Sequence, residues 1–166
     1  MKIQKSKTLI IATILVLAAT GIAYAGITMT LDRDMVDFRT MEKGETREIS
    51  DQGVYHNQVT CTSTNDKTWY LKVHTIRGFS SGAHVIPNEH FQWKVVTVVN
   101  GKGIVNGNIN QANSFQDMSS LVYTSDPLDN TGTEVKLQFR YILTVPKNQI
   151  AGNYFASVRW TMTELL

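Results

Sequence analysis

The side chains that could carry out chemistry do not fall into a metal-binding pattern. Asp32, Asp34 and Asp37 form a short acidic run, but a calcium loop also needs a glycine and a distal bidentate acid, and neither is placed there. We therefore expect a solvated turn between two strands at this run. A zinc site needs three or four ligands in fixed geometry, and the histidines form no His-x-His or His-x-x-x-His pair. They are expected at the surface or at strand ends: His56, His74, His84 and His90.

Nucleophilic catalysis is not indicated either. The one Gly-x-Ser-x-Gly match, Gly78-Phe79-Ser80-Ser81-Gly82, leads into no predicted helix and therefore does not indicate a nucleophile elbow. No glycine-rich phosphate loop precedes a helix either. Cys61 is the single cysteine and follows Val59 at strand spacing, which predicts a buried small hydrophobic side chain, with intermolecular pairing as the alternative. Paired glycosidase carboxylates are invisible in one sequence, so a secreted hydrolase stays open as a third hypothesis. We expect a non-enzymatic protein without a cofactor.

The aromatic residues are the most informative candidates for binding. Trp69 and Leu71 are two residues apart, and so are Trp160 and Met162. In an extended strand this spacing places both members of a pair on the same face. Each pair could pack in a core between two sheets or form an apolar binding strip, because tryptophan has a large flat face and one N–H donor.

The elements that position these residues are predicted to be strands. From Glu134 to Pro146, apolar residues occupy every second position, and the same period recurs from Tyr154 to Met162. The short turn-rich connection between these two segments predicts that they lie antiparallel or in facing sheets. No window shows apolar residues at helical spacing with caps. The fold class expected is an all-β antiparallel sandwich, immunoglobulin-like, in one domain over residues 26–166.

Earlier strands are weaker but recur at similar intervals. Thr46 to Ser50 is polar and is expected at an edge, and Phe91 to Val99 is expected to be buried on both faces. Arg77 to His84 is expected to be an exposed loop. The Asn- and Gly-rich stretch from Asn100 to Asn113 is expected to be a hairpin or a long loop.

Residues 1–25 are typical of a secretory signal peptide. A basic start precedes an uncharged apolar run from Leu9 to Ala19, and small residues end at Ala25, which predicts cleavage between Ala25 and Gly26. An uncleaved membrane anchor is the alternative, since the stretch is barely long enough to span a bilayer. The 166-residue chain has 16 basic and 14 acidic residues. Because Lys2, Lys5 and Lys7 lie in the leader, 13 basic and 14 acidic residues remain after cleavage.

The C-terminal segment resembles the end of WxL-domain surface proteins. That family shows Val-Pro, then Ala-Gly-x-Tyr, then a strand closing in Trp-x-Leu, and here the segment from Val145-Pro146 through Ala151-Gly152-Asn153-Tyr154 to Trp160-Thr161-Met162 follows that order. Trp69-Tyr70-Leu71 is similar to the family's first motif. The chain departs from the family in Met162, in the lack of a following proline and in the shorter spacing between motifs. The resemblance implies an exported sandwich that binds peptidoglycan, with Trp69, Leu71, Trp160 and Met162 in the attachment motifs.

Together these features predict a secreted protein that acts at the cell surface. We expect adhesion to the cell wall or assembly with other surface proteins, through sheet edges and apolar strips. The alternatives are a carbohydrate-binding module and a pilin-like or coat-like structural subunit. The net charge is too small to indicate nucleic acid as a partner. Contact with a membrane is expected only during export, in a bacterial cell.

Overall fold

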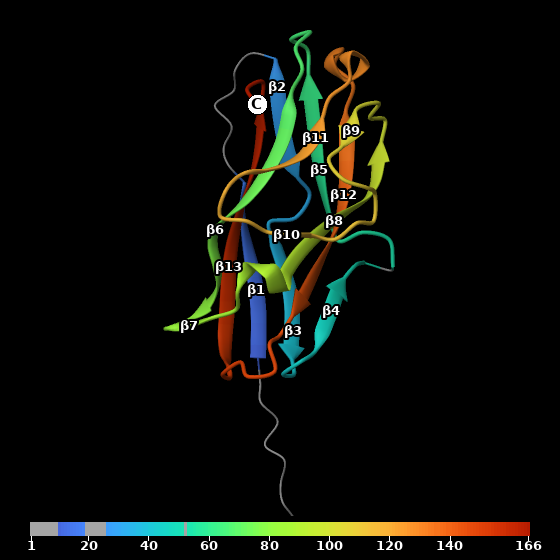
Figure 1. Ribbon diagram of the computed structural model, residues 1–166. Helices are drawn as coiled ribbons and strands as arrows, with labels where there is room; N and C mark the ends of the chain where they lie inside the picture. The colour runs from blue at the N-terminus through green and yellow to red at the C-terminus, as the bar shows by residue number, and fades with distance from the viewer. Residues whose placement is uncertain (1–9, 19–25, 52) are drawn as a thin grey trace, which may run out of the picture.

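Two β-sheets face each other in the computed structural model, which describes residues 10–18, 26–51 and 53–166 (Figure 1). Residues 10–18 are described by their backbone. Sheet A contains, in spatial order, β3 (Met35–Met41), β1 (Ile10–Ala18), β13 (Gly152–Thr163), β6 (Tyr70–Ser81), β11 (Ser120–Thr124) and β9 (Ile104–Val105), with β7 (His84–Val85) beside β6. Sheet B contains β10 (Asn113–Ser114), β8 (Phe91–Val99), β12 (Val135–Thr144), β5 (Asn57–Ser63) and β2 (Ile27–Leu31), with β4 (Thr46–Ile49) beside β12. The prediction of an all-β antiparallel sandwich is confirmed.

The strongest alternating segments lie in opposite sheets. β12 is a central strand of sheet B and β13 is a central strand of sheet A, so of the two arrangements expected for this pair, facing sheets is the one adopted. In β12 every second residue is buried and the others are half-buried. Such alternation arises because successive side chains of a strand point to opposite faces of the sheet. The polar segment predicted at an edge is β4, which pairs with β12 over Tyr141–Thr144.

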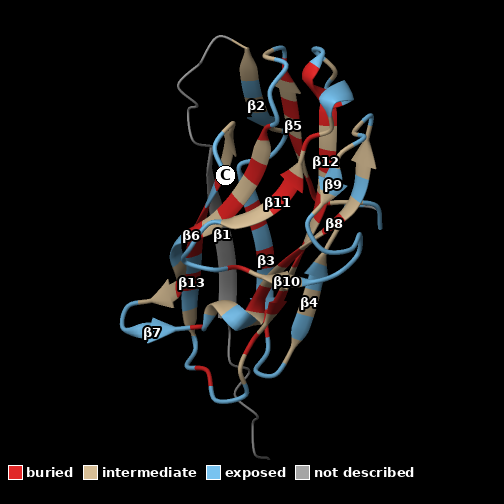
Figure 2. Cartoon of the chain, turned by 45° about the horizontal axis from the view of Figure 1, so that its top comes forward, coloured by how far each residue is buried: buried red, intermediate tan, exposed pale blue. Residues whose placement is uncertain are grey.

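Both sheets contribute buried residues to the core between them (Figure 2), and the largest fully buried side chains there are aromatic. Phe91 stacks on Phe115 with ring centroids 4.1 Å apart, and Phe139 contacts Trp160 at 4.6 Å. Cys61 is completely buried among these residues, as predicted, and burial raises the pKa of its thiol. With its cysteine unpaired, the domain depends on this packing for stability rather than on a disulfide.

Two local predictions are wrong. The segment from Arg77 to His84 is not an exposed loop, because β6 continues through it to Ser81 and forms a hairpin with β7. Phe79 in this segment is 1% exposed and packs edge-on against Phe91 at 4.9 Å. The Gly and Ser residues around it suggested a loop, but β13 pairs with this part of β6 and fixes it as a strand. β8, expected to be buried on both faces, is buried only on the face of Phe91, Trp93 and Val95, and the opposite face is half-buried.

The expected export segment overlaps a strand of sheet A. Ile10–Ala18, from the apolar run assigned to the leader, forms β1, whereas the cleavage residue Ala25 lies outside the described residues. The Asn-rich stretch contains β9 and ends at β10, joined by turns. Among the residues that the structure describes, no helix is long and apolar enough to cross a membrane. The only helical elements there are the short 3-10 turns Asn88–His90 and Pro127–Asn130.

Candidate functional site

The four residues of the Trp-x-Leu-like motifs come together on neighbouring strands. β6 and β13 are adjacent and antiparallel, and their register places Met162 opposite Leu71 and Trp160 opposite Val73. Trp69 directly precedes β6. Sequence reasoning paired these residues only within each motif, whereas the fold makes both motifs part of one ladder.

Three of these side chains lie in the core. Trp69, Leu71 and Trp160 are 0% exposed, and Met162 is half-buried. Trp69 packs against Tyr123, with ring centroids 5.3 Å apart. A sugar-binding platform needs an exposed aromatic face, so these indoles do not form one. Of the four residues, Met162 is the one whose side chain reaches partly to the surface.

The acidic run forms hydrogen bonds to the backbone, and of the histidines His56 lies close to it. Asp32 accepts a hydrogen bond from the Gln58 backbone N–H at 2.6 Å, and Asp37 accepts one from the Arg39 N–H at 2.7 Å. These carboxylates therefore bind backbone N–H groups of β5 and β3. Within the described ranges, no group of three His, Cys, Asp or Glu side chains is arranged to hold a metal ion.

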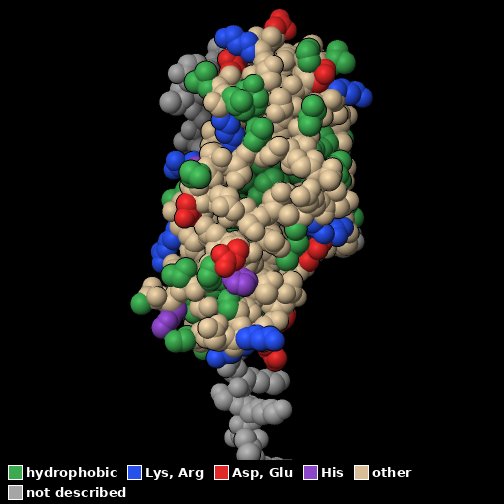
Figure 3. Space-filling view, viewed as in Figure 1, with side chains coloured by type: hydrophobic (Ala, Val, Ile, Leu, Met, Phe, Trp, Pro, Cys, Tyr) green, Lys and Arg blue, Asp and Glu red, His purple; other side chains and the backbone are tan. Residues whose placement is uncertain are grey.

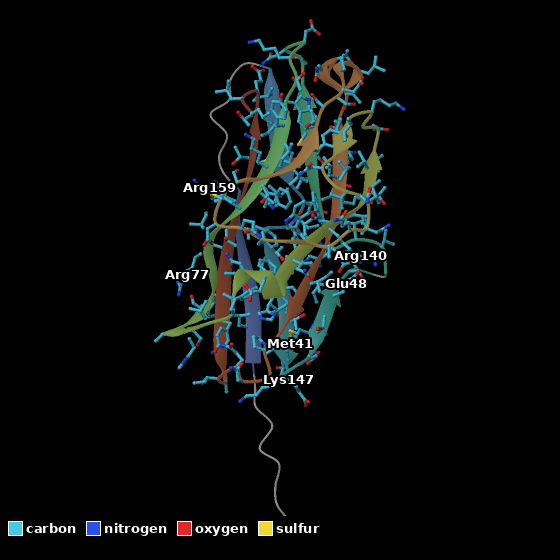
Figure 4. The ribbon with its side chains drawn as sticks, in the orientation of Figure 1. Met41, Glu48, Arg77, Arg140, Lys147 and Arg159 are labelled. Atoms are coloured by element: carbon cyan, nitrogen blue, oxygen red, sulfur yellow. The ribbon has the colours of Figure 1, made fainter. Side chains whose placement is uncertain are left out.

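A charged hollow is lined by residues of β3 and β4 and of the segments beside them. Arg33 pairs with Asp51, and His56 Nδ1 lies 3.7 Å from the same carboxylate. Close by, Glu48 binds Lys94 at 2.8 Å and Arg140 at 2.9 Å. Figure 4 shows Glu48 and Arg140 lying close together beside β4. Acidic and basic groups thus largely neutralise one another in this hollow.

The lowered pKa values of the carboxyl groups in the hollow argue against general acid catalysis by these groups. The hydrogen bond from Arg33 lowers the pKa of Asp51. Burial raises the pKa of Glu48, but the hydrogen bonds from Lys94 and Arg140 outweigh it, so that this pKa is also lowered. A carboxyl group that donates a proton near neutral pH needs a raised pKa instead. Burial lowers the pKa of His56, which keeps its imidazole neutral at pH 7.

A buried carboxylate that sequence reasoning missed organises the far end of the sandwich. Asp129 is 0% exposed. Its Oδ1 accepts the Lys102 N–H at 2.8 Å, and its Oδ2 accepts the Tyr123 hydroxyl at 2.7 Å and the N–H groups of Gly103 and Asp126, each at 3.0 Å. Burial and this carboxylate raise the pKa of Tyr123. The cluster ties two loops together and is structural; the Asp126-x-x-Asp129 spacing of a capping box was its sequence signal.

The position of β1 inside sheet A and the edge strand β2 of sheet B offer the clearest binding chemistry. β1 pairs in parallel with β13 over Ile10–Ala18 and antiparallel with β3 over Ile10–Leu15. It therefore lies between two strands that do not pair with each other (Figure 1). On the opposite sheet, β2 is an edge strand paired only with β5 among the described residues. Unpaired backbone at such edges can bind another extended segment through ladder hydrogen bonds.

The described surface that faces the viewer in Figure 3 shows no strongly charged patch. On the face shown in Figure 3, side chains of both signs are interspersed. Arg77 and Arg159 project from the exposed outer face of sheet A, on β6 and β13 (Figure 4). Neither a family model nor a curated protein matches the chain. The functional argument therefore depends on the fold and its edges.

Proposed function

We propose that the chain is exported and works at the cell surface as a non-catalytic protein that assembles with other surface proteins. The observation that carries this proposal is that the tryptophan side chains are buried, whereas strand edges remain unpaired. The three tryptophans are used in the core, at 0% to 2% exposure, which leaves sheet edges as the main means of recognition. Strand addition at an edge uses backbone hydrogen bonds for affinity and alternate side chains for specificity.

Adhesion to the cell wall is the second candidate, and one observation favours it. The register of β6 and β13 brings the two Trp-x-Leu-like motifs into one ladder, with Leu71 opposite Met162. In the proteins that this segment resembles, such motifs attach to peptidoglycan. Here the partly exposed Met162 is the member that could contact a wall polymer directly.

Export is tested by expressing the full-length chain in a bacterium and separating the cytoplasm, membrane, wall and medium. We expect the protein in the wall or medium fraction, with Gly26 as its first residue by N-terminal sequencing. Cytoplasmic accumulation of the intact chain would overturn the proposal. A membrane-held chain with residues 1–25 attached would support the anchor alternative instead.

Assembly and adhesion are separated by two sedimentation measurements on the exported protein. Self-assembly predicts fast-sedimenting species in the protein alone, and adhesion predicts sedimentation only with purified peptidoglycan sacculi. For adhesion we expect Met162→Lys to reduce binding to sacculi. Ile104→Lys is the matched control, because Ile104 is 73% exposed on β9, away from the motif strands. Equal binding by the two variants would remove Met162 from the wall-binding hypothesis.

A further inference from the structure

β1 connects β3 to the rest of sheet A. Among the described residues, β3 pairs only with β1, and β1 pairs on its other side with β13. The buried residues Val36 and Phe38 of β3 and Ala156 and Val158 of β13 border this place. Without a strand there, the facing backbone edges of β3 and β13 would lose their hydrogen-bond partners, which is costly for groups shielded from water.

Cleavage of the leader would remove β1 from the protein. Cleavage between Ala25 and Gly26 detaches Ile10–Ala18 from the rest of the protein. The processed domain then has a place in sheet A, about nine residues long, that was occupied in the precursor. A strand supplied from elsewhere could restore both ladders there.

We propose that this place receives the N-terminal segment Gly26–Leu31 of a second copy, so that processed copies join head to tail. This inference rests on the proposed export and processing. Gly26–Leu31 has no charged side chain, so its only charge is the new terminal amine, and it alternates the apolar residues Ile27, Met29 and Leu31 with threonines. It begins at the new chain end, so that it can enter a neighbouring sheet without threading a loop.

The pairing pattern favours transfer of this segment between copies. In its own copy β2 is half-buried on its apolar face and pairs on one side, with β5 over Ile27–Leu31. Between β3 and β13 a strand pairs on both sides. The exchange gives up the β2–β5 ladder and the hydrogen bond from the Thr64 N–H to the Gly26 carbonyl at 2.7 Å. It gains two ladders in place of one.

The residues after β2 favour a neighbour over the same chain as the recipient. To fill its own sheet, β2 would have to fold back on β3 through residues 32–34. Hydrogen bonds to β5 fix the first two of those residues. Asp32 accepts the Gln58 N–H at 2.6 Å, and Asn57 Nδ2 donates to the Arg33 carbonyl at 2.7 Å. Gly26–Leu31 can swing outward from Asp32 with these contacts intact. Because donor and acceptor surfaces differ, the contact is heterologous, and its repetition builds an open chain or, where the rotation closes, a ring.

The test uses the chain exported and processed by the cell, with cleavage verified by mass, in sedimentation velocity runs over a range of protein concentrations. We expect a concentration-dependent series of oligomers. A synthetic peptide of the Ile10–Ala18 sequence with terminal lysines should compete for the acceptor place and convert oligomers to monomers. A scrambled peptide of the same composition should have no effect. Oligomers whose sedimentation is unchanged by either peptide would overturn the proposal.

Variants of the donor strand provide an independent measurement. Met29→Asp places a charge on the apolar face of β2 and should raise the concentration needed for half-assembly by about tenfold or more. Met118→Asp is the control, because Met118 is 82% exposed in the loop before β11, outside the donor and acceptor strands, and this variant should assemble like the wild type. Circular dichroism and the thermal midpoint verify that each variant is folded, and the peptide competition remains decisive if Met29→Asp is not.

Failure of the inference is distinguishable from failure of the proposed function. A chain that is exported and processed but stays monomeric at every concentration overturns strand exchange alone. This outcome is expected if β3 closes directly onto β13 or if β2 folds back within its own copy. A chain that is not exported, or that keeps residues 1–25, overturns both.

Discussion

Replacing Asp129 with asparagine tests the best-defined polar cluster in the core. Oδ1 accepts one N–H, from Lys102, while Oδ2 accepts from Gly103, Tyr123 and Asp126. An amide has only one acceptor oxygen, so whichever way the asparagine turns, its NH₂ group faces at least one donor. The less costly orientation directs the amide oxygen at the three donors and leaves the Lys102 N–H without a partner.

The expected loss follows from this geometry. The Lys102 N–H is only partly buried, so leaving it unpaired costs about 1 kcal/mol, and each of the three remaining hydrogen bonds loses roughly 0.7 kcal/mol because its acceptor is no longer charged. The total is about 3 kcal/mol in the free energy of unfolding. For a domain of this size, that loss lowers the thermal midpoint by about 9 °C.

Urea unfolding followed by tryptophan fluorescence measures this loss. Asp117→Asn is the matched control, because a single oxygen of Asp117 accepts both the Thr75 hydroxyl at 2.8 Å and the Asn88 amide at 2.7 Å. An amide oxygen can accept both bonds, and the residue is exposed, so we expect a loss below about 1 kcal/mol. If Asp129→Asn were no more destabilising than Asp117→Asn, the argument from two acceptor oxygens would be refuted.

Three further predictions concern packing, exposure and pH. A Cβ at Gly103 would lie 2.1 Å from the Thr124 carbonyl oxygen, so Gly103→Ala should destabilise the protein far more than Gly78→Ala, whose Cβ would meet the movable end of a side chain; urea midpoints compare them. Iodide should barely quench the three tryptophans until the protein is unfolded, since their exposures are 0% to 2%; strong quenching of the native protein would contradict the buried core. The pKa values of His56 and Asp51 are lowered in the folded protein, so the unfolded chain binds more protons. The free energy of unfolding should therefore fall as pH decreases below about 6.5, because of His56, and again below about 4, because of Asp51. Urea titrations at several pH values follow this trend, and His56→Gln should abolish the first decrease.

Strand alternation made the fold class predictable, but not the pairing of strands. β12 and β13 show the two-residue period clearly, whereas the connection between them is compatible with one sheet or two. In β6 the alternation is interrupted by Gly78 and Ser80, and the ladder with β13 overrides these weak strand formers. β1 is a continuous apolar run, which in sequence has the same pattern as the core of a leader.

The surroundings of candidate residues were less predictable than the residues themselves. The same-face spacing of Trp69 and Leu71 was visible, but core and surface positions share that spacing. Their burial depends on the opposite sheet, which supplies neighbours distant in sequence. The cluster around Asp129 was hidden for the same reason, because its donors come from a loop before β9 and from β11.

The direction of β1 has a mechanical consequence. β1 enters sheet A at one end of the molecule, and its parallel neighbour β13 runs to the opposite end, where the chain terminates (Figure 1). A pull applied at these two ends acts along the strands and shears their ladder, so that its hydrogen bonds share the force together instead of opening one after another. A strand held in this place therefore gives the domain tensile strength along its long axis.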